Sequence, residues 1–296
     1  MQESGADPAV HFSDANFERA VRMALPFKNQ ATNQICVSDV ESITVLDAGS
    51  SRIADVAGIE ALRGLQSLNL RCNHLTNLDL SACASIQGVS CGNNPLAKLN
   101  LSGCARLQYL FCDNGELTDL DLSACTNFLT LGCKNNQLTN LNVMACANLR
   151  NLLCENNRLA KLNVPVCASF QKLFCENNRL TTLDVSGCSN LRNVDCGHNQ
   201  LTNLNVSGCC KLQNLDCAND RLAEINISAC PCLENLKCCS NRLTVLNISS
   251  NGMLTYVDAT GNAITNIIVW WEPPTKDNKP VAFQFLYDGN PTFSNP

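Results

Sequence analysis

The spacing of the cysteines limits the folds open to this chain more than any other feature of its sequence. Eight cysteines lie 21 residues apart from Cys91 to Cys238, and a second series of eight runs from Cys83 to Cys230 with the same spacing. These two series hold most of the 21 cysteines. A fixed period of this length is typical of a solenoid, in which each repeat forms one coil that stacks on its neighbours.

Ten coils can be aligned on this period. They begin at Leu65, Ile86, Leu107, Phe128, Leu149, Phe170, Leu191, Leu212, Leu233 and Leu254. Counted from 1 within a coil, apolar residues fall at positions 1, 4, 11, 14 and 16, and cysteine at 6 and 19. The alternation around positions 4 and 6, and again around 14 and 16, predicts two short strands in each coil. Stacked coils would then form two parallel sheets around one core.

Position 9 is asparagine in eight coils, and Gly115 and Asp220 take the other two places. A buried side-chain amide can bond backbone groups of neighbouring turns, where the strand ladder has ended and these groups would lack partners. We therefore expect the asparagines to form a ladder inside the turns.

With this pattern in place, the chain resembles leucine-rich repeats of the short 21-residue bacterial class, in which two similar half-repeats are nested. The resemblance rests on LxxLxCxxNxL followed by LxxLxLxxC, and the segment from Ile43 to Gly64 is similar to the internalin type of repeat. It implies a mainly β leucine-rich-repeat solenoid, with two parallel sheets and about ten to eleven coils, over residues 43–269.

The two ends of the array are expected to be capped, because an open solenoid end exposes core and strand edges. Residues 1–42 resemble an internalin-like helical N-terminal cap: Asp14 is a candidate N-cap, with Phe17, Val21 and Leu25 on one helical face. At the other end, residues 270–296 form the predicted C-terminal cap. There Trp270, Trp271 and the AFQFLYDG segment are expected to fold over the last coil.

The cysteine columns are interpreted as free, buried thiols that act as small apolar side chains. Coils stack about 4.8 Å apart, but side chains pointing the same way suit a disulfide torsion poorly. So many thiols favour the cytosol or an anaerobic environment. The resemblance instead implies a secreted or cell-surface protein, and residues 1–10 show no signal peptide. The localisation is left open.

Composition excludes several classes of function. A net charge of −5 argues against binding to a nucleic-acid backbone, and no apolar stretch is long enough to span a membrane. The three histidines lie far apart, and no nucleophile motif or phosphate-binding loop is present. We therefore expect a monomer without enzymatic activity or cofactor that acts as a protein-binding scaffold.

The outer face of the first sheet is the candidate binding site. Its outward residues vary from coil to coil, with an apolar centre and an acidic C-terminal half, whereas position 15 on the second sheet repeats Asp or Asn. We interpret position 15 as a solvated face rather than a calcium ladder. The predicted ligand-binding residues are Tyr109, Phe111, Leu153, Lys172 and Phe174, since outward aromatic residues often anchor protein partners.

Two other functions remain open at this stage. Cys209, Cys210, Cys230 and Cys232 fall in one turn region of two neighbouring coils, and thiolates there would suit Cu(I) or tetrahedral zinc. The same four residues can equally be two buried thiols beside two surface thiols, or contain a Cys210–Cys232 disulfide. The chain can also be a purely structural or adhesive surface protein.

Overall fold

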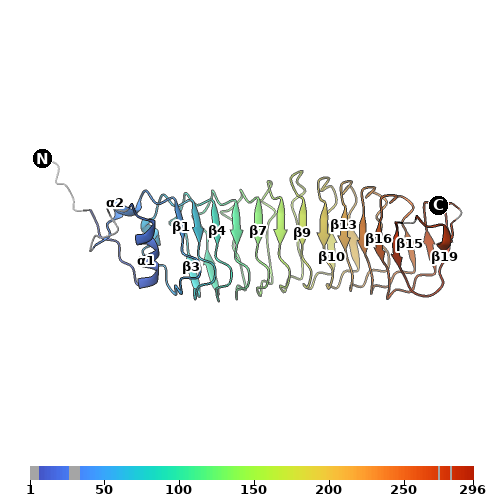
Figure 1. Ribbon diagram of the computed structural model, residues 1–296, viewed down its shortest axis with the longest axis horizontal. Helices are drawn as coiled ribbons and strands as arrows, with labels where there is room; N and C mark the ends of the chain where they lie inside the picture. The colour runs from blue at the N-terminus through green and yellow to red at the C-terminus, as the bar shows by residue number, and fades with distance from the viewer. Residues whose placement is uncertain (1–6, 27–33, 273, 281) are drawn as a thin grey trace. The chain divides into compact units, whose positions relative to one another are not determined.

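The computed structural model is a β-solenoid of about eleven turns (Figure 1). It describes residues 7–26, 34–272, 274–280 and 282–296. Parts of both predicted caps, including residues 1–6, lie outside these residues. The chain divides into two compact units, residues 1–138 and 139–296, which are described one at a time. Within the described residues, no helix has the length and apolar character needed to cross a bilayer.

The first unit begins with the expected helix. Helix α1 (Ala15–Ala24) starts at Asp14, whose Oδ1 accepts hydrogen bonds from the backbone nitrogens of Asn16 (2.8 Å) and Phe17 (3.1 Å). Phe17, Val21 and Leu25 are buried, which confirms the predicted apolar face. A second short helix, α2 (Val37–Val40), precedes the first coil, and a 3₁₀ turn, η2 (Ile59–Ala61), closes it.

The coils of the first unit then supply one strand each to a parallel sheet, in the order β1-β2-β4-β6-β7. These strands are β1 (Val45–Asp47), β2 (Ser67–Asn69), β4 (Gly88–Ser90), β6 (Tyr109–Phe111) and β7 (Thr130–Gly132). The second half-coils add a two-stranded parallel sheet of β3 (Asn77–Asp79) and β5 (Lys98–Asn100). The central residue of each first-sheet strand points into the core, as the period-2 pattern predicts.

The second unit has the same plan. Its first sheet runs in the order β8-β9-β11-β13-β14-β16-β18. The strands are β8 (Asn151–Leu153), β9 (Lys172–Phe174), β11 (Asn193–Asp195), β13 (Asn214–Asp216), β14 (Asn235–Lys237), β16 (Tyr256–Asp258) and β18 (Gln284–Leu286). The second half-coils pair β10 (Thr182–Asp184) with β12 (Asn203–Asn205), and β15 (Val245–Asn247) with β17 (Asn266–Ile268) and β19 (Thr292–Ser294).

The expectation of a second strand in every coil is wrong. Residues 119–121 and 224–226 form no strand, and Asn142 and Asn163 form only an isolated bridge. The backbone of these half-coils follows the same path as in the other coils because their apolar residues are still buried. Ile225, for example, is only 9% exposed. Burial of positions 14 and 16 therefore holds the second half-coil even where the strand ladder is interrupted.

The C-terminal segment differs from its prediction as well. Instead of folding over the last coil, the AFQFLYDG segment contributes β18, which pairs in parallel with β16. The chain then turns through Asp288 and Gly289 and adds β19 to β17. Trp271, Phe283 and Phe293 belong to a group of aromatic rings whose centroids lie 5.0–6.3 Å apart. Both sheets thus continue beyond residue 269, and the aromatic rings fill the end of the core. A 3₁₀ turn, η3 (Lys276–Asn278), lies in the connection.

The cysteine columns are buried, and many of their sulfurs bond to backbone carbonyls. All 21 cysteines fall within the described residues, and none of them forms a disulfide. At position 6, the thiol of Cys196 donates to the carbonyl of Asp216 in the next coil (3.3 Å). At position 19, the thiol of Cys209 donates to the carbonyl of Val185 in the coil before (3.2 Å). A cysteine therefore fills a small apolar space and also supplies a weak donor to a backbone carbonyl.

Candidate protein-binding face

The outer face of the first sheet in the second unit presents one row of position-5 side chains. Parallel pairing sets Phe174 beside Asp195, Asp195 beside Asp216, and Asp216 beside Lys237. The residue between the two outward positions of each strand is buried, so this row is held on the surface by the core beneath it. The acidic C-terminal half inferred from the sequence is thus assembled on adjacent strands.

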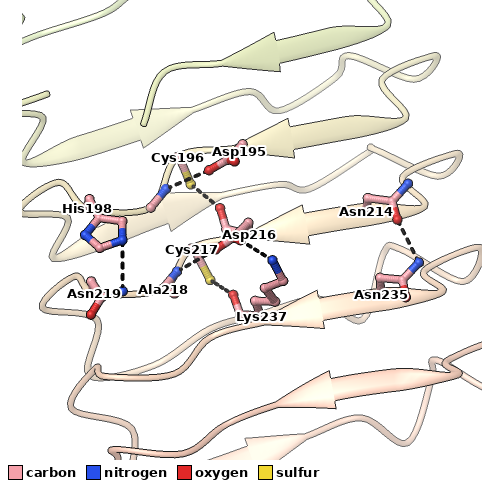
Figure 2. A network of polar contacts seen from close by, with 11 residues as sticks. Asp195, Cys196, His198, Asn214, Asp216, Cys217, Ala218, Asn219, Asn235 and Lys237 are labelled. Atoms are coloured by element: carbon pink, nitrogen blue, oxygen red, sulfur yellow. Dashed lines mark hydrogen bonds and ion pairs between the residues drawn. The ribbon is translucent and has the colours of Figure 1, made fainter. Parts of the chain in front are cut away.

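Asp216 lies at the centre of the row. Its Oδ2 atom pairs with Nζ of Lys237 at 3.1 Å, and Figure 2 shows the lysine side chain reaching across to it from the next strand. Its Oδ1 atom accepts from the backbone nitrogen of Ala218 (3.1 Å), which fixes the carboxylate against its own turn. The hydrogen bond with Asp216 raises the pKa of Lys237. Because the lysine is half exposed, this pair contributes little to stability and its cation stays available at the surface.

Asp195 has no comparable cation beside it among the residues that the structure describes. Burial, hydrogen bonding to the Glu176 carboxyl and the nearby charge of Asp216 raise the pKa of Asp195 to about 7. Its Oδ1 atom accepts from the backbone nitrogen of Gly197 at 3.3 Å, which opposes that rise. Asp195 and Asp216 therefore share one lysine, the Glu176 carboxyl lies beside Asp195, and an additional positive charge brought to this place would be stabilised.

A shallow hollow of about 290 Å³ lies over these strands. Phe174 and Tyr256 are among its apolar lining residues, and Asp195, Asp216 and Lys237 are among its polar ones. Phe174 and Tyr256 are both half buried, so each ring is held by its neighbours and still offers a surface. A concave patch with aromatic edges and a charged centre suits a side chain that carries both an apolar stem and a cation.

Amide side chains fix the two ends of these strands. Nδ2 of Asn235 donates to Oδ1 of Asn214 at 2.7 Å, and Nδ2 of Asn219 contacts Nε2 of His198 at 3.2 Å (Figure 2). His198 and Asn219 both have positive φ, 55° and 58°, as do the other residues at position 8 from Cys72 to Ser240. Asparagine is common there because it tolerates this left-handed conformation better than most residues do.

The predicted site residues fall into two groups, one in each unit. Tyr109 and Phe111 lie on β6 of the first unit; Tyr109 is 43% exposed, and the Phe111 ring lies over Gly132, where a Cβ would approach it to 2.9 Å. In the second unit Leu153 pairs with Phe174, while Lys172 pairs with Asn151. All five are at the surface or half buried. Sequence reasoning left Glu176 out, because position 7 follows the strand and carries no pattern of its own.

The four candidate metal ligands do not come together as a ligand set. Cys209 and Cys230 are fully buried, with their sulfurs directed to the carbonyls of Val185 and Val206. Cys210 is exposed and its sulfur contacts the carbonyl of Ser189, while Cys232 is partly exposed. In the described part of the chain, no three His, Cys, Asp or Glu side chains are placed to hold a metal ion. Burial raises the pKa of Cys209 to about 12, which disfavours the thiolate that a soft metal would require.

Comparison with known proteins agrees with this architecture. No family model matches the chain. Over 70 residues, 24% of its length, the chain is 44% identical to Internalin J of Listeria monocytogenes, and this match spans only 7% of that protein. The structure of the functional domain of InlJ from the same organism superposes with a TM-score of 0.69 at 27% identity, covering 97% of this chain and 72% of that one. That domain includes a cysteine ladder.

The chain is a leucine-rich-repeat solenoid. A leucine-rich-repeat protein of Leptospira interrogans has the same fold, with a TM-score of 0.66 at 21% identity over 81% of this chain and 64% of that one. The LRIM1/APL1C complex matches with a TM-score of 0.59 at 19% identity, over 73% of this chain and 50% of that one. The predicted fold and the internalin-like resemblance are therefore confirmed.

Proposed function

We propose that the chain is a non-enzymatic, protein-binding scaffold, and that the outer face of its first sheet contacts the partner. The hollow between Phe174 and Tyr256, with Asp195 and Asp216 at its centre, supports this most directly. The fold itself fits the role, since the matched LRIM1/APL1C structure is a complex and internalin domains share this solenoid. A parallel sheet with variable outward residues on a uniform core can change its specificity without changing its fold.

The chemistry of the hollow indicates what kind of segment it would accept. Asp195 and Asp216 face a single lysine, and Glu176 adds a further carboxyl beside Asp195, so a lysine or arginine of the partner would complete the charge balance. The aromatic rings would pack on the aliphatic stem of that residue or on an apolar neighbour. We therefore propose a partner segment in which a basic residue stands next to an apolar one.

A peptide-library selection on the purified protein tests this proposal. Bound peptides should be enriched in lysine or arginine beside apolar residues, and Asp195→Asn with Asp216→Asn should lose most of the enrichment. The matched control is Val245→Ser on β15, which removes an apolar side chain that is 44% exposed on the second sheet. Peptides that bind the double variant as well as the wild type would contradict the proposed face.

A further inference from the structure

The asparagine ladder at position 9 has the same geometry from coil to coil. Nδ2 of Asn199 donates to the carbonyls of Cys175 (3.0 Å) in the coil before and Cys196 (2.8 Å) in its own coil. Its Oδ1 atom accepts from the backbone nitrogen of Leu180 at 2.9 Å. Asn241 repeats these bonds two coils later, with the carbonyls of Cys217 and Cys238 and the nitrogen of Leu222. Each asparagine side chain thus accepts through its oxygen and donates through its amide nitrogen, and these bonds link two neighbouring coils.

Asp220 occupies the place between these two asparagines. Its Oδ1 atom accepts from the backbone nitrogen of Leu201 at 2.8 Å, as the asparagine oxygens do in the other coils. Its Oδ2 atom stands where the ladder has an amide nitrogen, is buried, and has no hydrogen-bond partner among the described residues. The register of the ladder sets this atom toward the carbonyls of Cys196 and Cys217, which are acceptors. An ionised carboxylate would therefore face two carbonyl oxygens with no hydrogen to share.

We propose that Asp220 is held as a neutral carboxylic acid whose Oδ2–H replaces the amide donor of the ladder, so that its ionisation loosens this one turn and makes it a pH-sensitive point of the solenoid. The side chain is 91% buried, since 9% is exposed, so an ion there is poorly hydrated. Asp220 is also the one ionisable residue at position 9 in the ten coils. Asp220 therefore interrupts the asparagine ladder, which is present in the coils on either side.

The surrounding groups act on the pKa of Asp220 in both directions, and the rise due to burial is the largest effect. Burial, followed by the hydrogen bonds from Leu201 and Asn199 and by the charge of Asp216, sets the pKa of Asp220 at about 7, with the burial and the Asp216 charge raising it. The thiols of Cys196 and Cys217 pack near it and have pKa values raised by burial. Of the basic residues close by, Arg221 is exposed, and His198 of the preceding coil contacts Asn219.

The sign of the pH effect on stability depends on which state, folded or unfolded, binds the proton of Asp220 more tightly. An aspartate in the unfolded chain titrates near 4, whereas the folded carboxyl holds its proton up to about 7. Between these values the folded state binds more protons than the unfolded state, so stability falls as pH rises. Above about 7 both states are ionised and the loss is complete. The turn also follows β13 directly after Asp216, so a looser turn would disturb the edge of the proposed binding face.

The decisive measurement compares the unfolding midpoint of wild type and Asp220→Asn from pH 5 to pH 8. The wild type should lose several degrees relative to the variant across this range, because the introduced amide would supply the missing donor at every pH. Asn178→Asp is the reciprocal control: it places a carboxyl in a ladder site of similar burial and should create a new pH dependence. An Asp195→Asn background removes a second carboxyl whose pKa is raised to about 7.

Hydrogen exchange gives a second, local readout. After correction for intrinsic rates, the Leu201 amide, which bonds Asp220, should exchange faster at pH 8 than the Leu180 amide, which bonds Asn199. In Asp220→Asn the two amides should behave alike at both pH values. A midpoint difference between wild type and Asp220→Asn that is the same at pH 5 and pH 8, or a Leu201 amide that does not respond to pH, would overturn the proposal.

Discussion

The two sheets of the solenoid use their outward side chains differently. In the second half-coils, position 15 is Asp or Asn in nine of the ten coils, and Ile268 takes this position in the last. Oδ1 of Asp184 accepts from the backbone nitrogen of Ser186 (2.9 Å), and Oδ1 of Asn226 accepts from that of Ser228 (3.1 Å). Here the side chains complete the turns of their own chain. On the first sheet, Asp195 and Asp216 accept the same kind of turn bond, but Phe174 and Lys237 do not, and the second oxygen of Asp216 reaches the neighbouring strand. Repeated side chains therefore serve the fold, whereas varied ones are available to a partner.

The largest effect should come from the cores of the two half-coils. Leu215→Ala on β13 should lower the free energy of unfolding by about 3 kcal/mol, because it empties a site enclosed by paired strands. Ile225→Ala in the same coil should cost less, about 2 kcal/mol, because its half-coil makes no strand and can relax into the space. Urea unfolding of both variants measures the difference. Equal losses of free energy would show that a half-coil without a strand relaxes no more easily than one with a strand.

The ladder that joins both half-coils should come next. Asn199→Ala removes the donors to Cys175 and Cys196 and the acceptor of Leu180, and leaves these backbone groups buried without that partner. We expect a loss of about 2.5 kcal/mol in the free energy of unfolding. The control is Asn205→Ala on the outer face of β12, which should cost less than about 1 kcal/mol. If the two changes cost the same, the ladder contributes no more than a surface turn does.

Binding should respond to the first sheet with little change in stability. Phe174→Ser with Tyr256→Ser should leave thermal unfolding nearly unchanged. The double change should weaken the binding of a selected peptide by about 2 kcal/mol, as loss of anchor residues does. Phe111→Ser tests separately whether the first unit takes part. Titration calorimetry with the Val245→Ser variant as the reference measures all three. A large loss of stability in the double variant would mean that the rings serve the core.

Charge at the same face should make binding depend on pH. The pKa of Asp195 is raised to about 7, so its negative charge appears as pH rises through that value. Affinity for a basic peptide should therefore increase from pH 6 to pH 8, while the contribution of Asp195 to stability falls between about 4 and 7. Asp195→Asn should flatten both trends. Peptide affinity that decreases over this interval would assign the opposite sign of charge to the ligand.

The smallest effect concerns metal. Wild-type protein loaded anaerobically with zinc or Cu(I) is expected to bind no more metal than Cys210→Ser with Cys232→Ser, because two of the four sulfurs are buried against carbonyls. Metal analysis after desalting measures the ratio. If the wild type binds one metal ion more than the double variant, the cysteines of this turn form a metal site after all.

The sequence predicted the fold well because its information is periodic. Leucine at positions 1, 4 and 11 and cysteine at 6 and 19 recur often enough to define the core, and Asp14 is a local capping signal for α1. Interruptions of the second sheet, such as at residues 224–226, could not be predicted. Ile225 keeps the apolar residue expected at position 14, and only the backbone fails to form a strand there.

The site was harder to predict for a related reason. Phe174 and the acidic row follow from position 5, but the proximity of Glu176 to Asp195 depends on where a turn places a side chain. Likewise, Asp220 reads in the sequence as a tolerated substitute for asparagine. The difference between one nitrogen and one oxygen becomes important only when its burial is known.

The columns of buried thiols give the molecule sixteen reporters of its own motion. A thiol at position 6 or 19 can react with an alkylating reagent only while its coil is open, since the closed coil excludes solvent. Burial also raises the pKa of Cys91, near one end of the array, to about 12. The labelling rate of each cysteine therefore measures the opening free energy of one coil, without any engineered probe. Peptide mass spectrometry of such a reaction would record, coil by coil, where the array frays and where it stays shut.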